Sequence, residues 1–303
     1  MKSKTSAWIS AARLRTLPLS VSGIIVGISL AISEGHFNST IAMLCIATTI
    51  SYQVLSNFAN DYGDGVKGTD NKDRVGPVRA LQSGVIGKDE MKRGIYVTVL
   101  ISFLLTIILI YKAFGSDSLF LTLVFLLLGI VSVIAAIKYT VGGGAYGYRG
   151  LGDLFVFVFF GLVSVIGSYF LFTKQWNWLT LFPAISIGML SVGVLNLNNM
   201  RDRESDAKAG KITLVVRIGD EFAKYYHYYI IISAMFFSIL YTIFTYNSSV
   251  NFLYFLSFVP LVLHLKRVYN TKNSKLLDPE LKKLALSTFL FALLFALSIN
   301  IFL

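Results

Sequence analysis

The sequence predicts an all-α, polytopic membrane protein with nine transmembrane helices. The 303 residues are 55% hydrophobic and only 14% charged, with a mean hydropathy of +0.69, and a soluble domain of this length needs no such composition to bury a core. Apolar segments recur along the whole chain. The basic residues are confined almost entirely to alternate loops.

The apolar segments are long enough to cross a bilayer core, which takes about 17–25 residues of helix. The first segment follows basic residues, as a signal peptide does, but the number of spans after it favours an uncleaved helix. We expect one transmembrane domain over residues 1–303. The predicted spans are 17–33, 40–58, 94–112, 118–137, 154–172, 178–198, 225–245, 250–265 and 284–303.

The distribution of charge supports this number of spans. All but two of the 27 lysines and arginines, Lys112 and Lys174, lie in the N-terminal segment and in every second loop. The positive-inside rule therefore places the N-terminus in the cytoplasm and the C-terminus outside. The net charge of +11 then reflects topology in an inner (cytoplasmic) membrane, and we expect no nucleic-acid partner.

The acidic residues concentrate in two of the cytoplasmic loops. The first loop contains SNFANDYGDGVKGTDNKDRVGPVRALQSG, residues 56–84, and the second contains NLNNMRDRESDAKAGKITLVVRIG, residues 196–219. Each stretch begins at the end of an apolar span, the second and the sixth, and passes from asparagines into spaced aspartates. Because the two stretches are four spans apart, we expect two parallel four-helix halves plus a ninth helix.

The spacing of the aspartates predicts a metal site. If the helices continue into these stretches, Asn60 and Asp64 share a face at i, i+4, as do Asp202 and Asp206. Stacked carboxylates repel each other unless a cation lies between them, and oxygen-only ligands favour a hard ion such as Mg²⁺. The alternative is solvated charge at helix ends, but acidic residues at a helix C-terminus oppose the helix dipole.

Two further features narrow the chemistry. The histidines His36, His227 and His264 are isolated in sequence, which argues against zinc. Arg79 and Lys211 lie close to the aspartates along the chain. A metal ion together with lysine and arginine neutralises a diphosphate. The alternative is that each basic residue only marks the cytoplasmic side of the membrane.

These motifs resemble those of the UbiA superfamily of membrane prenyltransferases. Asn60 and Asp64 fit the first two positions of the family motif N-x-x-x-D-x-x-x-D, while Gly68 stands at the third position and Asp70 follows it. Asp202 and Asp206 fit the second motif, D-x-x-x-D. The wording is closest to the 1,4-dihydroxy-2-naphthoate polyprenyltransferase branch, with ARLRTLPLSVSGIIVG and GGGAYGYRGLGDLFVFVFFG as two further matching stretches. The similarity reaches about residue 220, and we expect the last three helices to carry only hydrophobic length.

The resemblance implies a helical bundle around a central cavity that opens to lipid, with the active site at the cytoplasmic face. It implies transfer of a polyprenyl group from polyprenyl diphosphate to 1,4-dihydroxy-2-naphthoate, with Mg²⁺ as cofactor and the lipid bilayer as surroundings. The products would be demethylmenaquinol, diphosphate and carbon dioxide. The expected metal ligands are Asn60, Asp61, Asp64, Asp70, Asp202 and Asp206, and the expected diphosphate-binding residues are Arg74, Arg79, Lys138 and Lys211.

The loop KYTVGGGAYGYRGLGD, residues 138–153, is expected to cap the acceptor ring. We expect Tyr139 and Asp153 to take part in catalysis, with Asp153 as a base or as the group that orients a hydroxyl. The expected acceptor-binding residues are Tyr139, Tyr146, Asn57 and Asn199. The alternative is an ordinary turn with interfacial tyrosines, in which Asp153 only caps the following helix.

Two other functions compete with this one. A related enzyme of the same superfamily would prenylate 4-hydroxybenzoate or haem, but Gly68 with Asp70 and the stretch GYRGLGD favour the naphthoate branch. An ion-coupled transporter would carry ionisable groups near the bilayer midplane. Here the charges lie at the cytoplasmic ends of the spans, where a polar substrate head meets a membrane-embedded tail.

Overall fold

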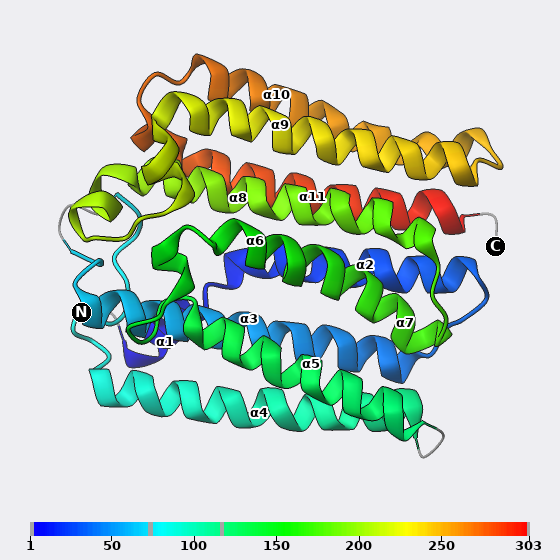
Figure 1. Ribbon diagram of the computed structural model, residues 1–303, viewed down its shortest axis with the longest axis horizontal. Coiled ribbons are helices and arrows are strands. Elements are labelled where there is room, and N and C mark those ends of the chain that lie inside the picture. Colours follow the sequence, from blue (N-terminus) through cyan, green and yellow to red (C-terminus); the bar gives the residue numbers. More distant parts are fainter. Residues whose placement is uncertain (1–2, 72–74, 116–117, 302–303) are drawn as a thin grey trace.

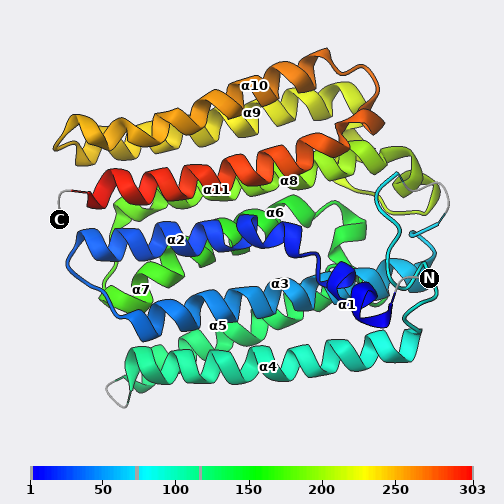
Figure 2. The same ribbon diagram turned by 180° about the vertical axis from the view of Figure 1, so that it is seen from behind.

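The helices of the protein run side by side along one axis and form an elongated bundle (Figure 1). The computed structural model describes residues 3–71, 75–115 and 118–301, and within these ranges it contains helices and turns but no strands. The N- and C-terminal ends lie at opposite ends of the bundle, as an odd number of spans requires (Figures 1 and 2). The all-helical prediction is therefore confirmed.

The α-helices alternate with short 3₁₀ segments and one π-helical segment. The α-helices are α1 (Lys4–Ala12), α2 (Leu17–Ser33), α3 (Ser39–Lys67), α4 (Lys88–Phe114), α5 (Leu119–Lys138), α6 (Gly152–Val156), α7 (Ser168–Thr173), α8 (Leu181–Lys208), α9 (Leu214–Thr245), α10 (Phe258–Asn270) and α11 (Asp278–Asn300). The π-helical segment is η3 (Phe157–Gly167), and the 3₁₀ segments are η1 (Leu14–Thr16), η2 (Tyr146–Arg149), η4 (Trp178–Thr180), η5 (Ser249–Ser257) and η6 (Ser274–Leu277).

Nine segments in the described part of the chain are long and apolar enough to cross a membrane, which confirms the predicted number. The helices extend further than their apolar cores. Helix α3 ends at Lys67 rather than residue 58, and α8 ends at Lys208 rather than residue 198. Both acidic motifs therefore lie on the last turns of continuous helices, as the i, i+4 prediction required.

Small residues let the helices around η3 approach closely. A Cβ atom at Gly161 would lie 2.6 Å from the Cα of Gly188 on α8, and one at Gly23 on α2 would lie 1.9 Å from the hydroxyl of Ser164. Both distances are shorter than any nonbonded contact, so a larger residue would push the helices apart. Small residues are the usual means of tight packing between membrane helices. Helices α2 and α8 are thereby held on either side of η3.

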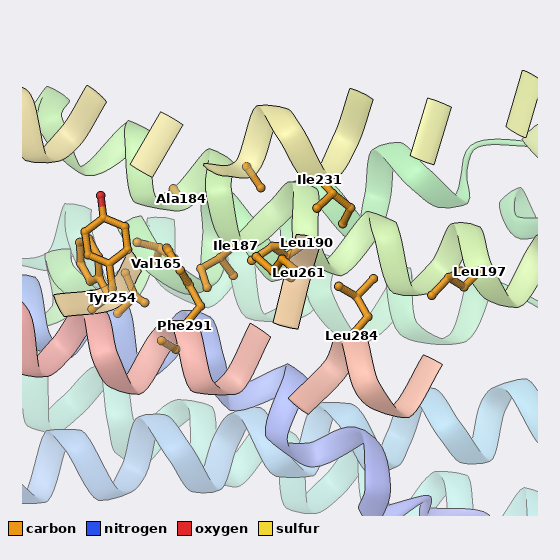
Figure 3. Close-up of a cluster of buried hydrophobic side chains, with 14 of the residues drawn as sticks. Val165, Ala184, Ile187, Leu190, Leu197, Ile231, Tyr254, Leu261, Leu284 and Phe291 are labelled. Carbon is orange, nitrogen blue, oxygen red and sulfur yellow. The ribbon is translucent and has the colours of Figure 1, made fainter. Parts of the chain in front are cut away.

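The main hydrophobic core lies between α8, α9, α10 and α11, and residues of α2, η3, α7 and η5 also belong to it (Figure 3). Leu190 and Ile187 on α8 meet Leu284 and Phe291 on α11, and Tyr254 packs against the same core. Dispersion contacts and close packing hold these helices together, because lipid tails are as apolar as the side chains. The C-terminal helices therefore pack closely against α8.

Candidate functional site

A cavity of about 1260 Å³ opens between α2, α3, α4, α5, η3, α8 and α11. Its polar end is lined by Asn60, Asp64, Arg79 and Lys211, which lie at the cytoplasmic ends predicted for the spans. The rest of its wall is largely apolar and includes Leu109, Ile110, Phe125, Phe159, Phe160 and Val163. Small-molecule sites usually enclose about 300–1,000 Å³. The cavity can therefore hold a charged head group together with a long apolar chain.

The first acidic cluster, Asp61, Asp64 and Asp70, is centred on the buried carboxylate of Asp64. The Arg79 Nη1 atom donates to Asp64 Oδ2 at 2.9 Å and lies 3.2 Å from Asp70 Oδ2. The hydroxyl of Tyr148, in the glycine-rich loop, donates to Asp64 Oδ1 at 2.8 Å. The structure thus brings Asp64, Asp70 and Arg79 together, as predicted, and adds Tyr148, which the sequence analysis did not assign to the site.

Asp61 is hydrogen-bonded to the backbone of the following loop. Its two carboxylate oxygens accept the N–H groups of Ala80 and Leu81, at 3.1 and 3.3 Å. These bonds hold the segment that presents Arg79 to Asp64. Asp61 was expected to be a metal ligand and it lines the cavity, but each of its oxygens is already engaged by one of these N–H groups. We therefore assign it to positioning the Arg79 loop.

The second acidic cluster, Asp202 and Asp206, is arranged differently. The Lys211 ammonium lies 3.5 Å from Asp206 Oδ1, and Asp206 Oδ2 has no hydrogen-bond partner among the described residues. Both oxygens of Asp202 accept hydrogen bonds from the guanidinium of Arg201, at 2.8 and 2.5 Å. The same guanidinium reaches Asp278 on α11 at 2.5 Å. Arg201 and Asp278 were both missed from the sequence.

The donor atoms of the two clusters fit a hard metal ion. They are carboxylate and amide oxygens, which Mg²⁺ prefers, and the buried Asp206 Oδ2 is an acceptor without a partner in the described part of the chain. Within that part, no three acidic, histidine or cysteine side chains gather closely enough to hold a metal. The basic side chains of Arg79, Lys211 and Arg201 lie against the carboxylates instead.

Electrostatics keeps the basic residues of the site charged. Burial works against the protonated form of Lys211, but Asp64 and Asp206 outweigh it, so the pKa of Lys211 is raised. The pKa of Arg79 is raised in the same way, against burial, mainly by Asp64. Burial and the charge of Asp64 raise the pKa of Tyr148, which remains a phenol able to donate. The polar end of the cavity therefore presents fixed cations to an anionic ligand.

An aromatic wall borders the charged end. The ring of Tyr146 stacks on Phe155 with centroids 3.8 Å apart and meets Tyr139 edge-on at 5.3 Å, and all three residues line the cavity. The Tyr146 hydroxyl donates to the carbonyl of Ala135 at 2.8 Å, which leaves the ring rather than the hydroxyl to meet a ligand. The structure thus places Tyr139 and Tyr146 where an aromatic acceptor could stack.

Asp153 lies behind this wall. It is buried in the first turn of α6, beside Tyr139 and Tyr226, and is not among the described residues that line the cavity. A base that takes a proton directly from a substrate must reach it within hydrogen-bond distance. Asp153 hydrogen-bonds Tyr226 and lies beside Tyr139 without lining the cavity, so the structure favours a positioning role over the expected direct one.

The remaining predicted residues fall in different places. Asn57 lines the cavity, but its Nδ2 donates to the carbonyl of Ala12 at 2.9 Å and ties α3 to α1. Asn199 is buried and is not among the described residues that line the cavity, whereas its neighbour Asn198 lines it. Lys138 is exposed beside Gly142, away from the lining. Arg74 lies outside the residues that the structure describes.

Two histidines that are isolated in sequence meet in space. The Nε2 atoms of His227 and His264 lie 2.8 Å apart, and His264 Nδ1 lies 2.8 Å from the carboxylate of Glu280 on α11. On the other side of the His227 ring, the Nδ1 atom lies 3.3 Å from Asn196 Nδ2. This buried polar chain links α8, α9, α10 and α11 outside the cavity. Together with Asp278, it corrects the expectation that the last three helices supply only hydrophobic length.

Residues 20–294 match the UbiA prenyltransferase family. The chain is 42% identical over 297 residues to 1,4-dihydroxy-2-naphthoate octaprenyltransferase of Escherichia coli (strain K12), covering 98% of this chain and 96% of that protein. It is 41% identical to the protein of the same name from Haemophilus influenzae (strain ATCC 51907 / DSM 11121 / KW20 / Rd), covering 98% and 97% of the two chains.

Solved structures share the fold at low sequence identity. A UbiA homolog from Aeropyrum pernix K1, in its apo form, superposes with a TM-score of 0.70 at 14% identity, over 93% of this chain and 97% of that one. A UbiA homolog from Archaeoglobus fulgidus bound to DMAPP and Mg²⁺ gives a TM-score of 0.59 at 14% identity, over 96% and 99%. The two acidic motifs, the cavity between them and these similarities lead to one conclusion: this chain belongs to the UbiA prenyltransferase family.

Proposed function

We propose that this protein is a 1,4-dihydroxy-2-naphthoate polyprenyltransferase of menaquinone biosynthesis. It transfers a polyprenyl group from polyprenyl diphosphate to the naphthoate ring and releases diphosphate and carbon dioxide, which gives demethylmenaquinol. The observation that carries this proposal is the identity of 41–42%, over nearly the whole chain, to relatives of that name. The cavity supports it, because one wall is charged, one is aromatic and the remainder is apolar.

The residues of the cavity have separate tasks in this reaction. The allylic C–O bond of the polyprenyl diphosphate breaks, a C–C bond to the ring forms, and the ring carboxylate leaves as carbon dioxide. Arg79 and Lys211 stabilise negative charge on the departing diphosphate, because both are cations at the polar end, Lys211 buried and Arg79 partly buried. Tyr139 and Tyr146 hold the electron-rich ring by stacking. The apolar wall holds the tail and excludes water, which would otherwise capture the allylic cation.

We further propose Mg²⁺ as the cofactor. The residues that would hold it are Asn60, Asp64, Asp70, Asp202 and Asp206, whose oxygen atoms match its preferred ligands. When bound, Mg²⁺ would neutralise the diphosphate and favour its departure. The Archaeoglobus fulgidus homolog bound to DMAPP and Mg²⁺ supports metal dependence in the family.

The reaction can be tested directly with purified protein. We would supply Mg²⁺, polyprenyl diphosphates of several lengths, and either 1,4-dihydroxy-2-naphthoate or 4-hydroxybenzoate, and separate the products by chromatography with mass detection. We expect a prenylated naphthoquinol and release of carbon dioxide, with no product when EDTA is present. Prenylation of 4-hydroxybenzoate in place of the naphthoate would contradict the proposed acceptor.

We propose that residues 1–303 form one transmembrane domain in the cytoplasmic (inner) membrane, with the active site facing the cytoplasm. The loops after α3 and α8 lie at the same end of the bundle as the N-terminus (Figure 2). A reporter fused after Leu303 should therefore read as periplasmic, and one inserted in residues 199–224 should read as cytoplasmic. Two reporters on the same side of the membrane would refute this topology.

A further inference from the structure

Arg201 bonds residues of two different helices, α8 and α11. The residue is 3% exposed, and its guanidinium bonds both oxygens of Asp202. It also donates to Asn198 Oδ1 at 2.9 Å and to Asp278 Oδ1 at 2.5 Å. Arg201, Asn198 and Asp278 all line the cavity. One planar group therefore bridges the second acidic cluster, on α8, to the first residue of α11.

This arrangement conflicts with metal binding at Asp202. A carboxylate whose two oxygens both accept from one guanidinium is already charge-paired, and the positive charge beside it repels a second cation. Asp202 is 5% exposed, and a buried carboxylate without a counter-charge is strongly unfavourable. A positive charge must therefore stay on Asp202 in every state of the enzyme. Either Arg201 or a metal ion can supply it, but not both in the same geometry.

We propose that Arg201 pairs with Asp202 in the metal-free protein and moves away when Mg²⁺ binds to Asp202. Asp278 is then the residue that holds Arg201 in its displaced position. The inference rests on the proposed Mg²⁺-dependent function and adds positioning residues to it. Asp278 is suited to this task because its side chain is 43% exposed and comes from a different helix. Arg201 can therefore swing away from Asp202 while it keeps its bonds to Asp278 and Asn198.

The first acidic cluster has no equivalent device in the described residues. Arg79 bonds Asp64, Asp70 and the carbonyl of Asn60, all of which belong to the predicted ligand set or its backbone. Displacement of Arg79 from Asp64 thus leaves it on another predicted ligand. Among the described ion pairs of the two clusters, that of Arg201 extends to a carboxylate outside both clusters, which makes Asp278 the specific element of the proposal.

A measurement of metal affinity distinguishes this proposal from a general effect of charge in the site. We would measure Mn²⁺ binding to the purified full-length protein by electron paramagnetic resonance, because Mn²⁺ accepts the same oxygen ligands as Mg²⁺. Arg201→Lys keeps the charge but cannot bond two carboxylates in a fork, so Mn²⁺ should bind roughly 3–10-fold more tightly. Asp278→Asn removes the alternative partner, so Arg201 stays on Asp202 and Mn²⁺ should bind about tenfold more weakly.

Glu204→Gln is the matched control. Glu204 joins α8 to η6 through an exposed ion pair with Lys275 at 2.8 Å, and it carries the same charge as Asp278. Its loss should change Mn²⁺ affinity by less than about twofold, because exposed pairs interact weakly. Three outcomes would each overturn the proposal. Mn²⁺ affinity could fall equally in Glu204→Gln and Asp278→Asn, it could stay unchanged in Arg201→Lys, or Mn²⁺ could bind to none of these proteins. Absence of prenyl transfer by the wild-type protein would instead contradict the proposed function, whatever the Mn²⁺ result.

Discussion

The two acidic clusters share the i, i+4 spacing of their polar residues but have different surroundings. Around the first, Arg79 and Tyr148 connect Asp64 to the loop after α3 and to the glycine-rich loop. Around the second, Arg201 connects Asp202 to the start of α11, and Lys211 stands near Asp206. The first cluster is therefore coupled to the loops beside the cavity, and the second to the C-terminal helices. Equivalent substitutions in the two clusters should accordingly have different consequences.

The largest effect is expected at the centre of the first cluster. Asp64→Asn removes the charge shared by Arg79, Lys211 and Tyr148, and turnover should fall by at least roughly 10²–10³-fold. Asp206→Asn should also be severe but smaller, because Asp206 contacts Lys211 alone among the described basic residues. Turnover and melting temperature of both purified variants would test the order. Wild-type turnover in either variant would remove it from the proposed metal site.

A smaller effect is expected when the bond between the first cluster and the glycine-rich loop is removed. Tyr148→Phe deletes the hydroxyl that donates to Asp64 but keeps the ring that lies 3.9 Å from the Lys67 ammonium. Loss of a hydrogen bond to a charged group costs about 1.5–3 kcal/mol, which corresponds to at least a tenfold loss of turnover. Steady-state kinetics would measure it. Unchanged kinetics would show that the loop does not depend on Asp64.

Asp153→Asn separates positioning from direct catalysis. A missing acid–base group costs roughly a hundredfold or more in turnover. Because Asp153 lies behind Tyr139, we expect a loss of about tenfold or less, together with a lower melting temperature from the first turn of α6. Turnover per folded molecule and melting temperature should be measured on the same sample. A loss beyond a hundredfold without destabilisation would restore Asp153 as the base.

The smallest effect on activity is expected in the buried polar chain of the C-terminal helices. His227→Leu leaves His264 Nε2 without its 2.8 Å partner, and unsatisfied buried polar groups cost about 1–3 kcal/mol of stability. We expect a lower melting temperature with turnover per folded molecule within about twofold of wild type, since the chain lies outside the cavity. A large loss of turnover at normal stability would show that the chain serves the reaction.

The sequence predicted the features that depend on local composition. Apolar length indicated nine spans, and the spacing of Asn60, Asp64, Asp202 and Asp206 placed them on two helix ends, because both signals are carried by neighbouring residues. The motif wording also indicated the family. The lengths of the spans were underestimated, because α3 and α8 continue as polar helices beyond the hydrophobic segments.

The tertiary structure alone decided which side chains share the site. Arg201 and Asp278 are 77 residues apart, and Tyr148 and Asp64 are 84 apart, so no local pattern could pair them. Packing of α11 against α8 places Asp278 on Arg201, and the turn of the glycine-rich loop places Asp153 behind Tyr139 rather than on the cavity. Charge and hydrophobic length determine which helices form and where their polar ends lie. The contacts between helices determine which of those polar groups meet, because close packing depends on the shapes of surfaces that are distant in sequence.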